Sequence, residues 1–232
     1  MRNSLWMTCV VLLSCSTMSF ATSISVSNHS FEDAGLAGGG WSDCIDVACG
    51  NPDPDDWINP DPSGVSNLNM AFAEVIAGFA ADGTHHVGID TDSPGLEVAQ
   101  SVDPFGLLPN TTYTLTVAVG NRNANFSPVG SLSTIALYVG GSATTGGTLV
   151  DAATIAPPAT ASTFADLTLV TNTGSTVPAG ALWIVLQNTG PVGRAHFDNV
   201  RLDATPIPEP STMMLLATGC CGLLASRRKR LR

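Results

Sequence analysis

Lysine is absent from the central part of this 232-residue chain, and arginine nearly so. Six of the nine basic residues lie close to the two ends, so residues 22–210 keep three arginines against all 19 acidic residues, a formal charge of −16. Such a surface would repel phosphate backbones, which excludes a nucleic-acid-binding protein. Charged residues make up only 12% of the sequence and hydrophobic residues 44%, a balance that supports a packed core and excludes a disordered chain.

Apolar runs long enough to span a bilayer are also missing near the N-terminus, where the run Leu5–Leu13 is too short. Small residues at Ser19 and Ala21 fit the −3 and −1 positions of a cleavage site. We therefore predict that residues 1–21 are an export signal, which signal peptidase removes before Thr22. A lipoprotein signal is the alternative, because the residues up to Cys15 loosely match a lipid-attachment box.

Residues 206–232 carry three features in a fixed order. A Pro-Glu-Pro triplet is followed by a short apolar segment over 211–226 and then by a basic cluster; these residues are Pro208, Glu209, Pro210, Arg227, Arg228, Lys229 and Arg230. This order resembles the PEP-CTERM sorting signal. The resemblance implies export in a bacterium with an outer membrane, cleavage by an exosortase-type protease near the triplet, and delivery to the cell surface or extracellular matrix.

The physical chemistry of this tail agrees with the resemblance. Residues 211–226 would form a single helix of about 24 Å, against a hydrocarbon core of roughly 30 Å, which suits a temporary anchor. The basic cluster would hold the C-terminus in the cytoplasm and leave the body outside. An ordinary single-pass tail anchor is the alternative.

Cysteine is scarce in the body, which holds only Cys44 and Cys49. In an exported protein two such cysteines are expected to pair, so we predict a disulfide that closes a small loop. A zinc site is the alternative, although two thiolates without a nearby histidine make an incomplete tetrahedral set.

Between the two ends the sequence predicts strands and no helices. Runs with an apolar–polar period of two, or with mostly apolar residues, occur at 24–27, 70–77, 86–89, 96–102, 113–119, 132–139, 163–171, 182–187 and 194–202. Leu182–Leu186 is apolar on both faces, which predicts a central strand. Many short strands with turn residues between them favour an all-β fold, a two-sheet jelly-roll-type sandwich in one domain over residues 22–205.

A second resemblance covers this body. Three segments, 28–32, 96–113 and 196–202, follow one another as in galactose-binding-like sandwiches and carbohydrate-binding modules. The resemblance implies the sandwich fold and sugar binding. It also implies a structural calcium ion, held by a glutamate near the first strand and an aspartate in the last strand, here Glu32 and Asp198.

The strand patterns give a separate argument for these two ligands. Asp198 would share a strand face with Val200 and turn inward, and Glu32 would be in phase with Ile24 if the first strand continued. Buried carboxylates need a cation or hydrogen-bond donors, and Ca²⁺ takes oxygen ligands. The alternative is that Asp198 caps a turn and Glu32 is solvated.

Other candidate sites are less specific. The aspartate-rich segment 43–61 and its two indoles, Trp41 and Trp57, suggest a sugar platform, because rings stack on sugars and carboxylates accept hydroxyl hydrogen bonds. The alternative is a solvated loop with Trp41 in the core. His85 and His86 are expected in a loop, since neighbouring strand residues make a poor metal pair.

Motifs for catalysis are absent from the sequence. It contains no Gly-x-Ser-x-Gly, no His-Glu-x-x-His and no Gly-rich phosphate loop. We therefore expect a non-catalytic surface or matrix protein that binds extracellular polysaccharide and needs no cofactor besides calcium. A secreted glycan-acting enzyme and a purely structural matrix component are the alternatives.

Overall fold

The computed structural model of the chain describes residues 21–32, 41–42, 57–58, 73–77, 79–90, 97–123, 125 and 130–208. The regular structure in these ranges consists of β-strands, and no helix in them is long and apolar enough to cross a membrane. The expected signal peptide, the C-terminal apolar segment and the Cys44–Cys49 pair lie outside the described residues.

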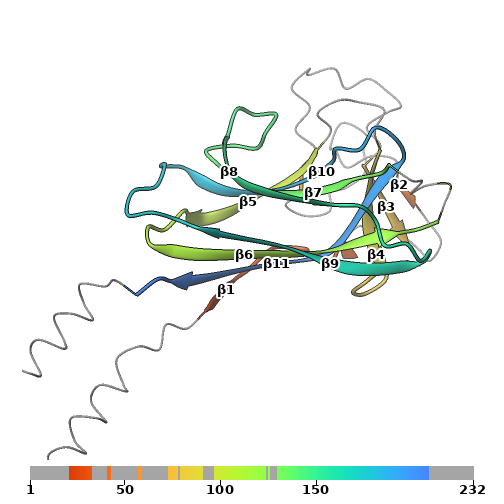
Figure 1. The fold of residues 1–232 in the computed structure, drawn as a ribbon, viewed down its shortest axis with the longest axis horizontal. Helices are drawn as coiled ribbons and strands as arrows, with labels where there is room; N and C mark the ends of the chain where they lie inside the picture. Colours follow the sequence, from red (N-terminus) through yellow and green to blue (C-terminus); the bar gives the residue numbers. More distant parts are fainter. Residues whose placement is uncertain are drawn as a thin grey trace, which may run out of the picture.

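The strands form two antiparallel sheets that lie one above the other (Figure 1). Sheet A has seven strands: β2 (Trp41–Ser42), β3 (Ala73–Ala77), β4 (His85–Asp90), β11 (Arg194–Pro206), β6 (Thr111–Asn121) and β9 (Thr163–Asn172) in this order, with β1 (Thr22–Ile24) also paired to β11. Sheet B has the order β5 (Glu97–Gly106), β10 (Ala181–Asn188), β7 (Ser133–Val139) and β8 (Thr148–Ile155). The predicted all-β, two-sheet sandwich is confirmed.

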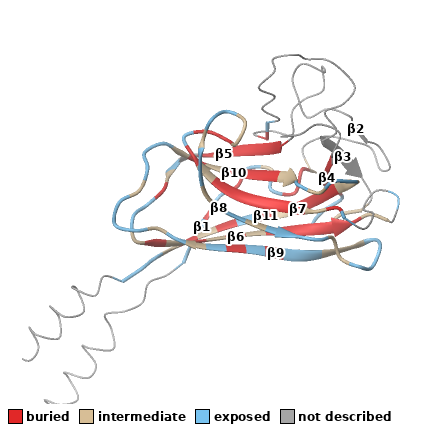
Figure 2. Cartoon of the chain, turned by 45° about the horizontal axis from the view of Figure 1, so that its top comes forward, coloured by how far each residue is buried: buried red, intermediate tan, exposed pale blue. Residues whose placement is uncertain are grey.

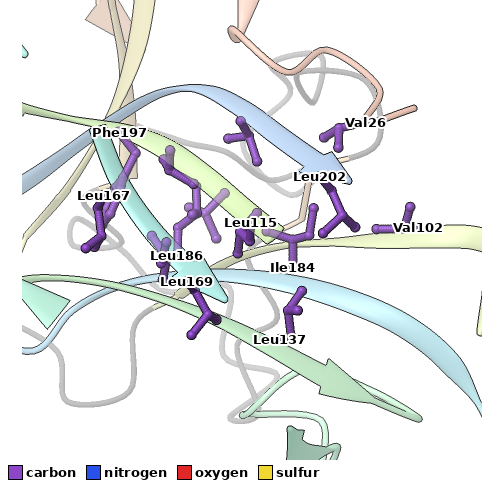
Figure 3. Close-up of a cluster of buried hydrophobic side chains, with 14 of the residues drawn as sticks. Val26, Val102, Leu115, Leu137, Leu167, Leu169, Ile184, Leu186, Phe197 and Leu202 are labelled. Atoms are coloured by element: carbon purple, nitrogen blue, oxygen red, sulfur yellow. The ribbon is translucent and has the colours of Figure 1, made fainter. Parts of the chain in front are cut away.

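The core lies between the sheets, and period-two sequence patterns build it. In β6 from Tyr113 to Val119, every second side chain points inward and is buried. The same holds for every second side chain of β10 from Leu182 to Leu186. Figure 3 shows Leu115 of sheet A and Ile184 and Leu186 of sheet B among the labelled side chains of the core, to which both sheets contribute. Each fully buried aliphatic side chain contributes about 1.5–3 kcal/mol to folding.

The positions of three strands follow from how apolar they are. β10 lies between β5 and β7, which confirms the prediction of a central strand over 182–187. β8, at the edge of sheet B, is mostly exposed or half-buried, and the sequence patterns did not predict it. β9, at the edge of sheet A, is also exposed on its outer side (Figure 2).

The two ends of the body lie next to each other. Thr22 pairs with Ala204 and Ile24 with Leu202, so the first strand adds to the last. The first strand stops at Ile24, and a turn over residues 27–30 follows. The sequence pattern suggested that Glu32 continues the alternation of the first strand, in phase with Ile24. It does not, because the strand has ended and Glu32 follows Phe31, which has a positive φ of 58°.

Candidate functional site

Asp198 is fully buried, but it is not on the face of β11 that the sequence pattern predicted. The pairing of β11 with β6 shifts register between Asp198 and Arg201, and Asn199 has a positive φ of 48°. This bulge turns Val200 toward the core while Asp198, next to the core residue Phe197, points to the outer face of sheet A. The expectation of a face shared with Val200 was wrong for this reason.

A turn formed by residues 81–85, here called the 81–85 turn, covers the Asp198 carboxylate. Asp198 Oδ2 accepts hydrogen bonds from the backbone N–H groups of Ala81 (2.5 Å) and Asp82 (2.9 Å), and Oδ1 accepts one from Asn199 (2.6 Å). Burial raises the pKa of Asp198 to about 6, although the three N–H donors act in the opposite direction. The pKa of this carboxyl group therefore lies close to neutral pH.

The Glu32 carboxylate holds the other end of the same turn. Its Oε1 accepts the backbone N–H groups of Thr84 and His85 (both 2.6 Å), and Oε2 accepts the Thr84 hydroxyl (2.8 Å) and lies 3.0 Å from His85 Nδ1. Burial acts to raise the pKa of Glu32, but these hydrogen bonds outweigh it and hold the pKa at about 2. Gly83, with φ of 69°, leaves the space that the carboxylate occupies.

Glu32 and Asp198, the two residues predicted to bind calcium, thus meet on one turn. Together their oxygens take part in seven hydrogen bonds with the protein. Ca²⁺ takes about six to eight oxygen ligands, each of which offers a lone pair to the ion. The lone pairs of these two carboxylates are already engaged, mainly by backbone N–H groups. As placed here, the pair does not fit the ion, and the described residues hold no convergent group of three His, Cys, Asp or Glu. The calcium site stays a prediction.

A cluster of two buried and two half-buried rings lies beside this turn on the outer face of sheet A. His86 Nε2 lies 3.1 Å from His196 Nδ1, and both side chains are fully buried. The rings of Phe79 and Phe164 stack at 4.5 Å, and His86 meets both edge-on. Burial lowers the pKa of His196 well below its usual range, and the nearby His86 lowers it further. His85 and His86 begin strand β4, so their predicted place in a loop was wrong.

An aromatic pair lies on the outer face of sheet B. Trp183 of β10 is directly opposite Tyr138 of β7, and both half-buried side chains pack on a small apolar cluster on that face, Ala99, Ala136 and Val185. Both side chains lie on this face because cross-strand partners point to the same side of a sheet. The sequence pattern predicts Trp183 in a strand apolar on both faces, but it gives no signal for its pairing with Tyr138.

Polar groups lie on the same face as this aromatic pair. Glu97, fully buried at the start of β5, accepts hydrogen bonds from Thr144 N (3.0 Å), Thr144 Oγ1 (2.6 Å) and Gln187 Nε2 (3.3 Å). Burial raises the pKa of Tyr138, and the Glu97 charge raises it further, so the phenol stays a hydrogen-bond donor. Apolar rings beside hydroxyl and amide groups suit a polyhydroxylated ring compound.

Of the two indoles predicted to form a sugar platform, Trp57 is buried in the core and the side chain of Trp41 is not described. Trp57 is 0% exposed, packs on Phe31 with ring centroids 5.2 Å apart, and donates its Nε1–H to the Asn28 carbonyl. Its ring is part of the core and is not presented to a ligand. Trp41 pairs with Ile76 in sheet A, and its side chain is outside the described residues.

Comparison with known proteins gives two family matches. Residues 22–203 match the family model called HpiC1-like, described as HpiC1 cyclase. Residues 206–230 match the PEP-CTERM protein-sorting motif, which confirms the interpretation of the tail. No curated protein sequence matches the chain.

Solved structures share the sandwich fold. A Stig cyclase, Fisc, from Fischerella sp. TAU in complex with (3Z)-3-(1-methyl-2-pyrrolidinylidene)-3H-indole is 23% identical, with a TM-score of 0.63 over 82% of this chain and 100% of that chain. A cyclase from the same organism in complex with 4-(1H-indol-3-yl)butan-2-one is 24% identical, with a TM-score of 0.61 over 81% and 100%. Carbohydrate-binding modules are more distant, for example one of family 4 at 15% identity and a TM-score of 0.46 over 78% and 99%.

Proposed function

The chain belongs to the HpiC1-like cyclase family and carries a PEP-CTERM sorting motif, and we propose, from the side chains described above, that it is an exported, non-catalytic surface or matrix protein whose sandwich binds polysaccharide. The sorting motif implies export, transient anchoring in the membrane and processing by an exosortase. Binding, rather than catalysis, is the role that the described side chains support best.

The observation that carries the proposal is the Trp183–Tyr138 pair. Two aromatic side chains on neighbouring strands of one outer sheet face offer apolar ring surface for the C–H face of a sugar. The Gln187 amide and the Thr144 hydroxyl lie on the same side and are of the type that bonds sugar hydroxyls. A polymer with repeated sugar units would engage such a surface along its length.

A second candidate is an enzyme, and one observation favours it. The family name describes a cyclase, and a general acid works best with a pKa near the operating pH, as Asp198 has with its value of about 6. The described geometry gives this acid no exposed edge, because Asp198 is fully buried under the 81–85 turn. We therefore place this candidate second.

One experiment separates the two functions. The purified body is mixed with insoluble polysaccharides, and both retention and product release are measured on the same samples. We expect retention without turnover, weaker retention in Trp183→Ala, and no change in Val170→Ala, which removes an exposed side chain from the other sheet. Turnover of a glycan, or conversion of 4-(1H-indol-3-yl)butan-2-one, would replace the binding proposal with the enzyme.

Processing is tested by intact-mass analysis of the secreted protein. We expect a mature chain that begins at Thr22 and lacks residues 213–232, because signal peptidase and exosortase each remove one end. Secreted material that retains the tail would contradict the role of the sorting motif.

A further inference from the structure

A cavity of about 470 Å³ opens on the outer face of sheet A, on the opposite side of the sandwich from Trp183 and Tyr138. Its walls come from residues 79–81, residues 162–166 at the start of β9, Ala118 of β6, and Asn199 and Arg201 of β11. Ligand sites in proteins span about 300–1,000 Å³, so this cavity is large enough for a sugar unit.

One wall of the cavity is aromatic and fixed. Phe164 stacks on Phe79, and the buried His86 ring meets both edge-on. Phe164 also lies across Gly120, where any larger residue would collide with its ring. The two rings are therefore held in place before a ligand arrives, which lowers the entropy lost on binding.

Another wall is polar and electrically balanced. Arg201 Nη2 donates to Asp166 Oδ1 at 2.7 Å, and its Nε–H points to the Asn199 carbonyl at 3.4 Å. The two charged side chains are 46% and 54% exposed, so both still reach the cavity. A guanidinium has five N–H donors and a carboxylate has two acceptor oxygens, so the pair keeps capacity for a ligand.

The charge balance selects the class of ligand. Arg201 and Asp166 cancel each other in the cavity, and the body as a whole is strongly acidic, so an anionic ligand gains nothing and is repelled at long range. A cation is attracted by the acidic body at long range, but Asp166 in the cavity is already paired with Arg201. Neutral ligands with an apolar face and adjacent hydroxyl groups match both walls.

We infer that this cavity is a second binding site, which takes one neutral pyranose unit with its C–H face toward Phe164 and Phe79 and its vicinal hydroxyls on Asp166 and Arg201. The inference does not depend on the Trp183–Tyr138 pair. If both sites bind, the two faces of one domain hold two saccharide chains at once, and the protein acts as a cross-linker.

The test is isothermal titration calorimetry of the purified body with glucose and methyl glucoside, and with glucuronate and glucosamine as charged counterparts. We expect the neutral sugars to bind at least tenfold more tightly than either charged sugar. Asp166→Asn leaves Arg201 uncompensated and should shift the preference toward glucuronate by at least tenfold. Arg201→Gln should shift it toward glucosamine by a similar factor.

Matched variants keep the two sites distinguishable. Trp183→Ala should leave the affinity for the monosaccharides unchanged, and Arg201→Gln should leave retention on polysaccharide by the sheet B face in place. Circular dichroism confirms that each variant is folded. Equal affinity for neutral and charged sugars, an unchanged preference in both charge variants, or no binding of neutral sugar would overturn the inference.

Discussion

Asp198 allows a quantitative test, because its burial should make the stability of the body depend on pH in a specific direction. The pKa of Asp198 rises from 3.8 to about 6 on folding. A group with a raised pKa in the folded state adds stability that is fully present below its unfolded pKa and is lost as the pH rises through its folded pKa. The window for Asp198 therefore runs from about pH 4 to pH 6.

The size of the effect follows from the shift. Each pKa unit corresponds to about 1.36 kcal/mol, so the folded protein should gain about 2–3 kcal/mol from Asp198 between pH 7 and pH 4. No discount for solvent screening applies, because the side chain is fully buried. The lowered pKa of His196 acts in the opposite direction, because the unfolded chain binds this proton more readily than the folded one as the pH falls, so a comparison between variants is required.

The assay is urea unfolding followed by tryptophan fluorescence at pH 4, 5, 6 and 7, for the wild type and for Asp198→Asn. The variant does not titrate at this position, so its free energy of unfolding relative to the wild type should change by about 2–3 kcal/mol across the range, with the wild type favoured at low pH. Asp203→Asn, the same change on the same strand, is the control. Parallel pH profiles for wild type and Asp198→Asn would refute the reasoning.

Three further outcomes are expected. Gly83→Ala should destabilise the body by about 1–3 kcal/mol in denaturant unfolding, because its φ is positive and the new Cβ would collide with the Glu32 carboxylate; an unchanged midpoint would contradict this. The predicted calcium site should give a melting temperature that chelator lowers and that no longer responds in Asp198→Ala; an unchanged melting curve with and without chelator would contradict the site and agree with the N–H donors that Glu32 and Asp198 already have. Thiol titration of the native exported protein should find Cys44 and Cys49 paired, and free thiols there would rule out the disulfide.

The sequence predicted the sandwich because its inner strands have a clear pattern. β6 alternates buried and half-buried residues from Thr111 to Thr116, and β10 is apolar on both faces, as its central position requires. β8 was missed because an edge strand with both sides largely exposed needs no regular alternation. A sequence pattern therefore predicts strands that have a buried face, and it does not predict a strand whose two faces are largely exposed.

The candidate site was only partly predictable, for a related reason. Glu32 and Asp198 were identified as a pair, but the direction of Asp198 depends on one bulge, with Asn199 in the left-handed region, and a one-residue shift reverses a strand face. The contact between His86 and His196 depends on the register of β4 against β11, which pairs residues far apart in sequence. Neither the bulge in β11 nor the register of β4 against β11 can be predicted from the sequence of one chain.

The pairing of β1 with β11 has a consequence for release from the cell membrane. Thr22 and Ala204 lie opposite each other, so both ends of the mature chain leave the domain at one pole. The Ile207 N–H still bonds the Asn110 carbonyl, and three more residues lead to Pro210, a reach of roughly 10 Å in extended chain. A protease that cuts at the Pro-Glu-Pro triplet, as proposed, would therefore act close to the folded end of the sandwich. An anchor that follows the triplet would place this pole nearer to the lipid than the opposite pole.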